Sequence, residues 1–186
     1  MEAESFHIHL AVQSLNQGKL IAYPTESMFG IGCDPNNLSA VERILEIKHR
    51  SPAMGLILIA SEISQLEPWV DFKQVPNMQP LLSSWPGHET WLVPAQKQVS
   101  NLLTGNHDTL AVRVSAHPIV RQLCNNFKAA ITSTSANKNS RPEAKSLFSA
   151  RQIFDAEIDY YVPGEITGLG GASRIRNALT GQVIRA

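Results

Sequence analysis

Ser133-Thr134-Ser135-Ala136-Asn137 is the stretch that decides the fold of this chain, because it follows the apolar run Ala129-Ala130-Ile131 with only Thr132 between them. The apolar run predicts a buried strand, and the hydroxyls and the amide then lie at the carboxyl end of that strand. Open α/β sheets bind ligands at the carboxyl ends of their strands. The stretch therefore predicts an α/β fold with an anion or nucleotide site at this point.

Predicted helices and strands alternate on both sides of this stretch. Helices are predicted over 6–15, ending before Gly18, over 118–124 from Pro118, and over 146–154. A further helix is predicted from an N-cap at Ser39, with Glu42 completing a capping box, to the basic cluster 48–50. Strands are predicted over 20–23, 56–59, 90–93, 110–114 and 160–162, with a hairpin around 180–181. We expect one compact α/β domain over 1–186 with a mixed sheet and flanking helices.

Composition limits the classes of protein and partner. The chain has 186 residues, with 16 basic and 16 acidic side chains, so no overall positive field attracts nucleic acid. Its two cysteines, Cys33 and Cys124, lack metal-ligand spacing, and no signal-peptide pattern is seen. The apolar stretch 56–60 is far shorter than the roughly 20 residues that span a bilayer. We expect a cytoplasmic protein without a membrane span.

Three basic side chains are candidates for binding a polyphosphate. Arginine offers a planar fork and lysine a point charge, so Lys48, Arg50 and Arg113 together suit a nucleoside triphosphate. The alternative for Lys48 and Arg50 is a solvated helix end stabilised by the helix dipole, because both are expected in a solvent-facing loop. The alternative for Arg113, which stands among apolar neighbours, is a structural ion pair.

The hydroxyl run has two interpretations as well. Ser133, Ser135 and Asn137 alternate, so in an extended segment they share one face and could hold phosphate oxygens or a small amino acid. They could equally form a turn that caps the next helix. Thr25 and Glu26, which follow Pro24 in a predicted loop, have the same ambiguity.

Several common site types are absent from the sequence. There is no P-loop or nucleophile elbow, and the glycines at 168–171 lack the strand-to-helix setting of a dinucleotide fingerprint. No metal site is predicted, since His7 and His9 fit a solvated N-terminal segment. Cys33 fits a buried structural thiol better than a nucleophile.

Taken together and in order, the motifs resemble the YrdC/TsaC family. The resemblance covers nearly the whole chain and indicates the short, single-domain form. The stretches that carry it are Tyr23-Pro24-Thr25-Glu26, Phe29-Gly30-Ile31-Gly32-Cys33-Asp34, Lys48-His49-Arg50, Trp85-Pro86-Gly87, Leu110-Ala111-Val112-Arg113-Val114, Ser133-Thr134-Ser135-Ala136-Asn137, Val162-Pro163-Gly164-Glu165, Ser173-x-Ile175 and Leu179-Thr180-Gly181.

The resemblance implies a twisted mixed sheet around a large concave cavity and an L-threonylcarbamoyladenylate synthase activity. Such an enzyme is a nucleotidyltransferase that converts L-threonine, bicarbonate and ATP into threonylcarbamoyl-AMP and pyrophosphate. The product serves the N6-threonylcarbamoyladenosine modification of tRNA. The implied partners are Mg²⁺ with ATP, a TsaD-TsaB-TsaE type transferase complex that takes the product, and a possible tRNA contact.

The same resemblance assigns roles to eight residues. Lys48, Arg50, Ser135 and Asn137 match the family's catalytic and ATP-binding tetrad. The positions associated with threonine and the carbamoyl-adenylate are matched by Thr25, Arg113, Ser133 and Ser173.

The chain also departs from the family pattern at four places. Met54 stands where a lysine or asparagine is common, His88 and Ala172 each replace a usual proline, and Lys138-Asn139-Ser140 replaces Leu-Ser-Gly. These departures keep open a diverged paralogue that acts as an RNA-binding module or uses another carbamoyl substrate.

Overall fold

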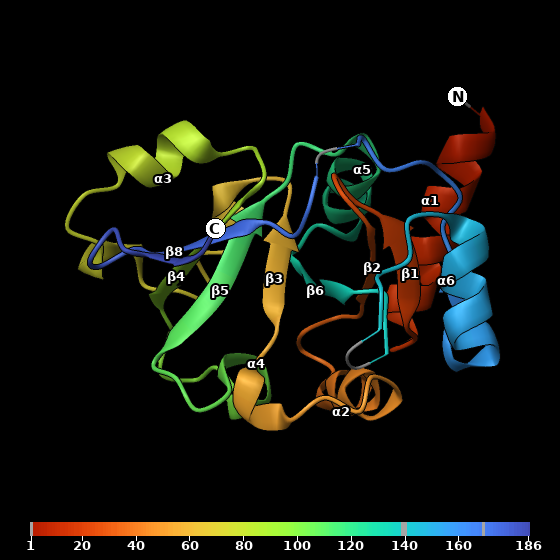
Figure 1. The fold of residues 1–186 in the computed structure, drawn as a ribbon, viewed down its shortest axis with the longest axis horizontal. Helices are drawn as coiled ribbons and strands as arrows, with labels where there is room; N and C mark the ends of the chain where they lie inside the picture. The colour runs from red at the N-terminus through yellow and green to blue at the C-terminus, as the bar shows by residue number, and fades with distance from the viewer. Residues whose placement is uncertain (1, 139–140, 169) are drawn as a thin grey trace.

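The computed structural model describes residues 2–138, 141–168 and 170–186, and the side chains of all of these except residues 2–4. Asn139 and Ser140, two of the departures named above, lie outside these ranges. Nine strands of the described chain form one sheet in the order β7-β1-β2-β6-β3-β5-β4-β8-β9 (Figure 1). None of the described helices is both long and apolar enough to cross a bilayer.

The sheet is mixed, as predicted. Parallel pairs join β1 to β7, β3 to β5 and β4 to β8, and the other neighbouring pairs are antiparallel. The strands are β1 (Ile21–Pro24), β2 (Phe29–Gly32), β3 (Ile57–Ala60), β4 (Glu89–Pro94), β5 (Thr109–Val114), β6 (Ile131–Ser135), β7 (Tyr160–Tyr161), β8 (Arg174–Asn177) and β9 (Val183–Arg185).

Six α-helices and four short 3-10 turns connect these strands in the described residues. The helices are α1 (Glu2–Asn16), α2 (Leu38–Ile47), α3 (Gln79–Ser84), α4 (Asn101–Thr104), α5 (Pro118–Phe127) and α6 (Leu147–Phe154). The 3-10 turns are η1 (Pro52–Met54), η2 (Ile63–Gln65), η3 (Phe72–Gln74) and η4 (Asp155–Glu157).

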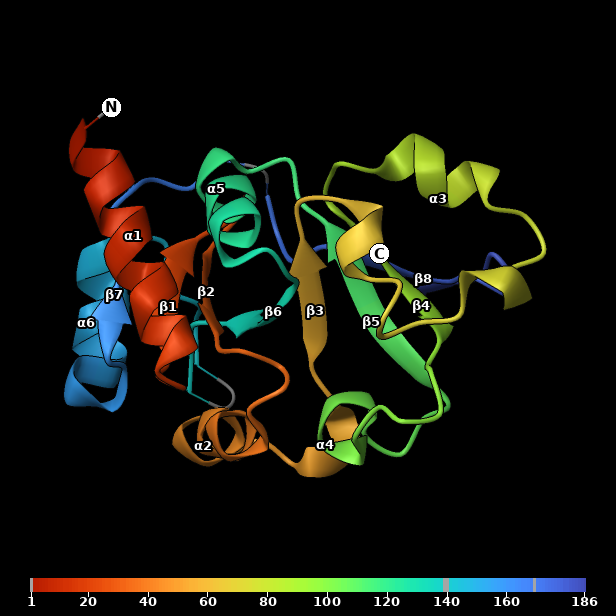
Figure 2. The ribbon, with the colours of Figure 1, turned by 180° about the vertical axis from the view of Figure 1, so that it is seen from behind.

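Two hydrophobic clusters hold the sheet. Alternate residues of β1 point to opposite faces, so Ala22 joins one cluster while Ile21 and Tyr23 join the other. Helices α1 and α5 supply the second cluster and lie together over one face of the sheet (Figure 2). In Figure 1, the opposite view, no helix lies in front of β3 and β6. The polar residues at the ends of the strands lie on this open face.

The predicted helices are confirmed with one correction, and one strand was missed. Helix α1 ends before Gly18, α5 begins at Pro118, and α6 is capped by Ser146. The N-cap of α2, however, is Asn37, whose side chain accepts a hydrogen bond from the Ala40 amide, so the Ser39 capping box was wrong. Strand β2 was not predicted, because its two glycines hide the alternation that marks a strand.

Candidate functional site

Two adjoining cavities open among the strand exits, and they share Arg50 and Ser135. The first has a volume of about 160 Å³, and its wall includes Thr25, Arg113, Ser133 and Ser173. The second has a volume of about 280 Å³, and its wall includes Lys48, Arg50, Ser135 and Asn137. Each of the two sets of four residues implied by the family resemblance therefore lines one cavity, and Arg50 and Ser135 line both.

Lys48 anchors the second cavity from inside the protein. Only 4% of its surface is exposed, and its ammonium donates to the backbone carbonyls of Ser135 and Asn137 and, at 3.1 Å, to Asn137 Oδ1. The expectation of a solvent-facing Lys48 was wrong. The residue is the C-cap of α2, and the end of this helix lies against the exit of β6. The Lys48 ammonium thus connects the end of helix α2 to the hydroxyl run through hydrogen bonds.

The charge on Lys48 has no acidic partner within 4 Å in the part of the chain that the structure describes. Burial lowers the pKa of Lys48 to about 8, and the nearby Arg50 acts in the same direction. A buried cation held only by neutral oxygens and beside another cation is stabilised by an incoming anion.

The hydroxyl run is ordered by its own contacts as well as by Lys48. Ser135 Oγ donates to Asn137 Oδ1 at 2.8 Å, and Asn137 Nδ2 donates to the Arg141 carbonyl at 2.7 Å. Ser133 and Ser135 lie in the extended strand β6 and line the same cavity, as the first interpretation held, and the chain bends only at 136–137. The alternative, a turn that caps the next helix, was wrong, because that helix is capped by Ser146.

Arg50 joins the two cavities. The chain turns at His49, which has a φ of 49°, and Arg50 Nε then donates to the Gly55 carbonyl at 3.2 Å. Burial lowers the pKa of Arg50, and the like charge of Arg185 adds to this effect. The terminal amino groups of Arg50 make no hydrogen bond or ion pair within the described residues, so they are available to a ligand.

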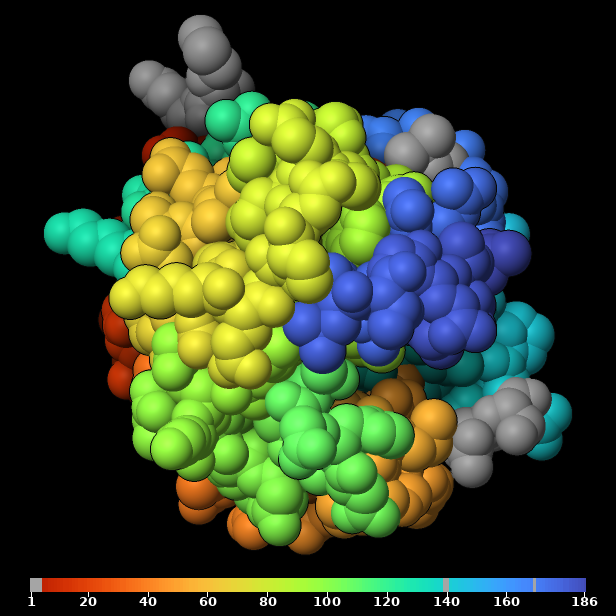
Figure 3. Space-filling model, turned by 90° about the vertical axis from the view of Figure 1, so that its left-hand side faces the viewer, coloured from red at the N-terminus to blue at the C-terminus, as the bar shows by residue number. Residues whose placement is uncertain are grey.

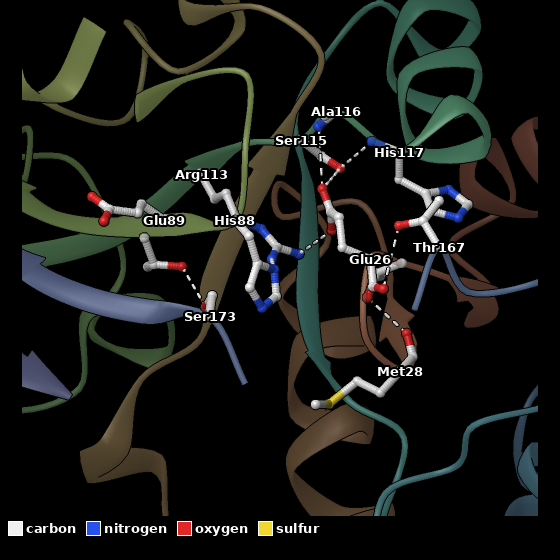
Figure 4. A network of polar contacts seen from close by, with 12 residues as sticks. Glu26, Met28, His88, Glu89, Arg113, Ser115, Ala116, His117, Thr167 and Ser173 are labelled. Atoms are coloured by element: carbon white, nitrogen blue, oxygen red, sulfur yellow. Dashed lines mark hydrogen bonds and ion pairs between the residues drawn. The ribbon is translucent and has the colours of Figure 1, made fainter. Parts of the chain in front are cut away.

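Arg113 belongs to a buried network that Figure 4 shows. Its Nη2 lies 3.3 Å from Glu26 Oε2, and Arg113 and Glu26 are 6% and 2% exposed. Glu26 Oε1 accepts from Ser115 Oγ at 2.6 Å and from the Ala116 amide at 3.1 Å. The ion-pair alternative for Arg113 is thus correct, and the same side chain also lines the first cavity.

The charges of this network are set by its partners. Burial alone would raise the pKa of Glu26, but Arg113 and the hydrogen bond from Ser115 outweigh it and hold that pKa below its usual range. Glu26 is therefore ionised at neutral pH and fixes Arg113 from one side. Arg113 Nε is buried and has no hydrogen-bond partner in the described structure.

The remaining assigned residues present hydroxyls. Thr25 Oγ1 donates to the Met28 carbonyl at 2.6 Å, and Ser173 Oγ lies 2.8 Å from Thr90 Oγ1. Ser133 lies on β6, two residues before Ser135, which pairs with Gly30 of β2, and a Cβ added at Gly30 would lie 3.4 Å from Ser133 Oγ. The glycine keeps the floor of the cavity open beside the serine.

Two residues of the first cavity, Arg185 and Glu143, were missed from the sequence, and His88 was given no structural role. Arg185 is on β9 at the end of the described chain, where the C-terminal segment packs at the surface (Figure 3). Its Nε and Nη2 donate to the Ser173 carbonyl at 3.1 and 2.7 Å. A lone arginine after Val183 and Ile184 in a short hairpin was the available signal.

The departures from the family pattern lie on the walls. Met54 lines the second cavity, while His88 and Ala172 line the first. Met54 is 61% exposed and presents apolar surface beside Lys48.

The site is suited to binding anions. Four cations, Lys48, Arg50, Arg113 and Arg185, line the two cavities, and the carboxylates near them are Glu143 at the wall and Glu26 behind Arg113. No cluster of three or more metal-ligating side chains occurs in the described residues. The hydroxyls and the single wall carboxylate fit a Mg²⁺ ion that keeps mostly phosphate and water ligands.

Comparison with known families gives a full-length match. The Sua5/yciO/yrdC model, described as "Telomere recombination", matches residues 13–186. Threonylcarbamoyl-AMP synthase of Hahella chejuensis is 41% identical over 97% of this chain and 98% of its own length. The enzyme of the same name from Nitrosococcus oceani is 42% identical over 100% of both chains.

Solved structures agree with the sequence comparison. P. abyssi Sua5 complexed with L-threonine matches with a TM-score of 0.86 and 31% identity over 93% of this chain, which spans 51% of that protein. E. coli YciO shares the fold, with a TM-score of 0.80 at 21% identity over 98% of this chain and 91% of its own. By its family model and by relatives aligned over their whole length, this chain belongs to the Sua5/YciO/YrdC family.

Proposed function

We propose that this protein is a threonylcarbamoyl-AMP synthase, which forms threonylcarbamoyl-AMP and pyrophosphate from L-threonine, bicarbonate and ATP. One observation carries the proposal: the residues assigned to ATP and those assigned to threonine line two separate cavities that meet at Arg50 and Ser135. A reaction that joins an amino acid derivative to a nucleotide needs such a junction. The name shared by the relatives in Hahella and Nitrosococcus supports it.

ATP is assigned to the cavity of Lys48, Arg50, Ser135 and Asn137. Lys48 keeps the turn at 135–137 in place and supplies a buried positive charge, while the free amino groups of Arg50 neutralise phosphate oxygens. The phosphates bring Mg²⁺ with them, and this ion adds charge neutralisation when it is bound.

Threonine is assigned to the cavity of Thr25, Arg113, Ser133 and Ser173. Arg113, held by Glu26, offers its remaining donors to the substrate carboxylate, and the three hydroxyls surround the position of a small polar side chain. The structure of P. abyssi Sua5 complexed with L-threonine supports threonine as the amino-acid substrate.

The chemistry takes place at the junction. The threonine amine attacks bicarbonate, and loss of water gives an N-carboxylate. One oxygen of this carbamate then attacks the α-phosphorus of ATP, the bond to the β-phosphate oxygen breaks, and pyrophosphate leaves. Arg50 and Ser135 border both cavities, so they can contact the α-phosphate as negative charge shifts to the leaving group. Positioning and charge neutralisation do the catalytic work, which is consistent with a wall rich in cations and hydroxyls.

The product is assigned to the N6-threonylcarbamoyladenosine modification of tRNA in the cytoplasm. A mixed carboxylic-phosphoric anhydride hydrolyses readily, so a TsaD-TsaB-TsaE type complex would take it up directly. The chain carries no net charge, so a direct contact with tRNA would have to rest on a local cluster of cations.

The test is pyrophosphate release from ATP, Mg²⁺ and bicarbonate with threonine, with serine, or with no amino acid. Release that requires threonine is expected, and threonine-independent release would contradict the proposal. Arg50→Ala should reduce this release sharply. The matched control is Arg121→Ala, an exposed arginine of α5 outside both cavities.

The RNA-binding alternative is tested by the salt dependence of RNA affinity. Contacts to several phosphates give a steep fall in affinity with salt, and a flat response rules them out.

A further inference from the structure

His88 connects two parts of the first cavity wall. Its Nδ1 lies 3.2 Å from Arg113 Nη1, and its Nε2 lies 3.3 Å from the carbonyl oxygen of Gly171. Figure 4 shows the ring beside the Arg113 guanidinium, on the far side from Glu26. The imidazole thus joins β5 to the segment that leads into β8.

The two contacts fix the protonation state of the ring. A guanidinium only donates hydrogen bonds, so His88 Nδ1 must accept and carries no proton. The carbonyl of Gly171 only accepts, so Nε2 carries the proton and donates. His88 is therefore a neutral imidazole in one defined tautomer.

The surrounding charges favour this neutral form. Burial and then Arg113 hold the pKa of His88 below its ordinary value, and Arg185 acts in the same direction. Glu26 and the hydrogen bond to Gly171 oppose them without reversing the shift. A second positive charge at His88 would face Arg113 directly and remove the acceptor for Nη1.

His88 and Glu26 hold Arg113 from two sides. Glu26 takes Nη2 and His88 takes Nη1, so the plane of the guanidinium is set by both contacts. Gly171 is two residues from Ser173, whose hydroxyl contacts Thr90 and whose carbonyl accepts from Arg185. The position of one ring therefore bears on both Arg113 and Ser173.

We propose that His88 is a positioning residue that orients Arg113 and the Gly171–Ser173 segment toward the carboxylate of the amino-acid substrate, so that protonation of His88 weakens amino-acid binding. This inference rests on the proposed function for its substrate. His88 is not one of the eight assigned site residues, and the proposal gives it a role in the affinity for threonine and in the pH dependence of that affinity.

The first experiment compares His88→Phe and His88→Gln with the wild type. Phenylalanine keeps the ring but has no acceptor, so we expect the KM for threonine to rise about tenfold while the KM for ATP stays within about twofold. Glutamine can accept and donate, so it should restore most of the affinity. Because the pKa of His88 is lowered, the KM for threonine in the wild type should rise only at pH values well below about 6.5, the ordinary pKa of histidine, and His88→Gln should remove this rise.

The matched control is His107→Phe, an exposed histidine outside both cavities, which should leave every parameter unchanged. A His88→Phe enzyme with wild-type KM for threonine and a wild-type pH profile would overturn the inference while leaving the proposed function intact. Equal increases in the KM for ATP and threonine would also overturn it, because they would indicate a general structural defect.

A second readout does not depend on activity. Nitrogen NMR of the His88 ring should show the Nε2–H tautomer at neutral pH and a pKa below the ordinary histidine value. In His88→Phe the guanidinium resonances of Arg113 should shift, while those of Arg43, paired with Asp159 elsewhere, should not. An Nδ1–H tautomer, or unchanged Arg113 resonances, would refute the positioning role even if threonine proved not to be the substrate.

Discussion

Glu26→Gln isolates the buried ion pair that holds Arg113. In the wild type, Glu26 Oε1 accepts from Ser115 Oγ and the Ala116 amide, and Oε2 faces Arg113 Nη2 at 3.3 Å. The amide oxygen of glutamine can keep the two hydrogen bonds at Oε1. Its NH2 group then occupies the position of Oε2, where a donor faces the donors of Arg113.

The expected loss of stability follows from burial. The substitution leaves the guanidinium of Arg113, which is 6% exposed, without a counter-charge. Removing one partner of a buried pair costs about 3–5 kcal/mol, and because the hydrogen bonds at Oε1 are retained we expect the lower end, about 3 kcal/mol. This is a large part of a total stability that is typically about 5–15 kcal/mol for a domain.

Urea unfolding measures this loss. The matched control is Glu157→Gln, since Glu157 pairs with Lys138 at 2.9 Å on the surface, and it should cost less than about 1 kcal/mol. Adding Arg113→Met to Glu26→Gln should recover part of the loss, with a coupling of about 2 kcal/mol. A Glu26→Gln protein as stable as Glu157→Gln, with additive effects in the double variant, would refute the reasoning.

Three further predictions concern Lys48, the packing of Gly32 in β2, and Arg185. In the protein without ligand the pKa of Lys48 is about 8, so the KM for ATP in the wild type should rise as the pH increases through that value. Lys48→Met should give a raised KM that no longer changes there. A wild-type profile that stays flat to pH 9.5 would contradict this. Gly32→Ala should destabilise the fold by about 2 kcal/mol or more in urea unfolding, because its Cβ would lie 2.2 Å from the Thr132 carbonyl oxygen. Gly170→Ala should not destabilise the fold, because a Cβ added there would have no atom within 4 Å. Arg185→Leu should lower kcat/KM for pyrophosphate release about tenfold with little loss of stability, and a wild-type value would show that the cation does not face the substrates.

Local patterns in the sequence were sufficient to predict much of the framework. The hydroxyl run does lie in the carboxyl half of a strand, although β6 begins only at Ile131, where the apolar run ends, and continues to Ser135. Lys48 does lie at the end of α2. Both features depend on short segments whose own composition sets their structure. The mixed sheet also followed, since alternating helices and strands with a terminal hairpin leave few other arrangements.

Features that depend on contacts distant in sequence could not be predicted. Lys48 is buried because the carbonyls of Ser135 and Asn137, 87 and 89 positions away, replace water around its ammonium. Arg185 reaches the cavity only because β8 pairs with β4 and brings the C-terminal hairpin beside it. The N-cap of α2 differed for a local reason: Asn37 and Ser39 are both good caps, and sequence alone did not choose between them.

The sheet order explains how a chain without net charge forms a cationic site. Strand β6 lies between β2 and β3, so the polar residues at its carboxyl end lie beside the end of α2, which precedes β3 in the chain. Arg113 comes from β5, the next strand beyond β3, and Arg185 comes from the hairpin at the far edge. Four cations from distant segments thus converge on one face, while acidic residues such as Asp159 and Glu157 form ion pairs outside both cavities. Binding of ATP should therefore depend on this local arrangement, and substitutions that change only the net charge of the chain should leave it unaltered.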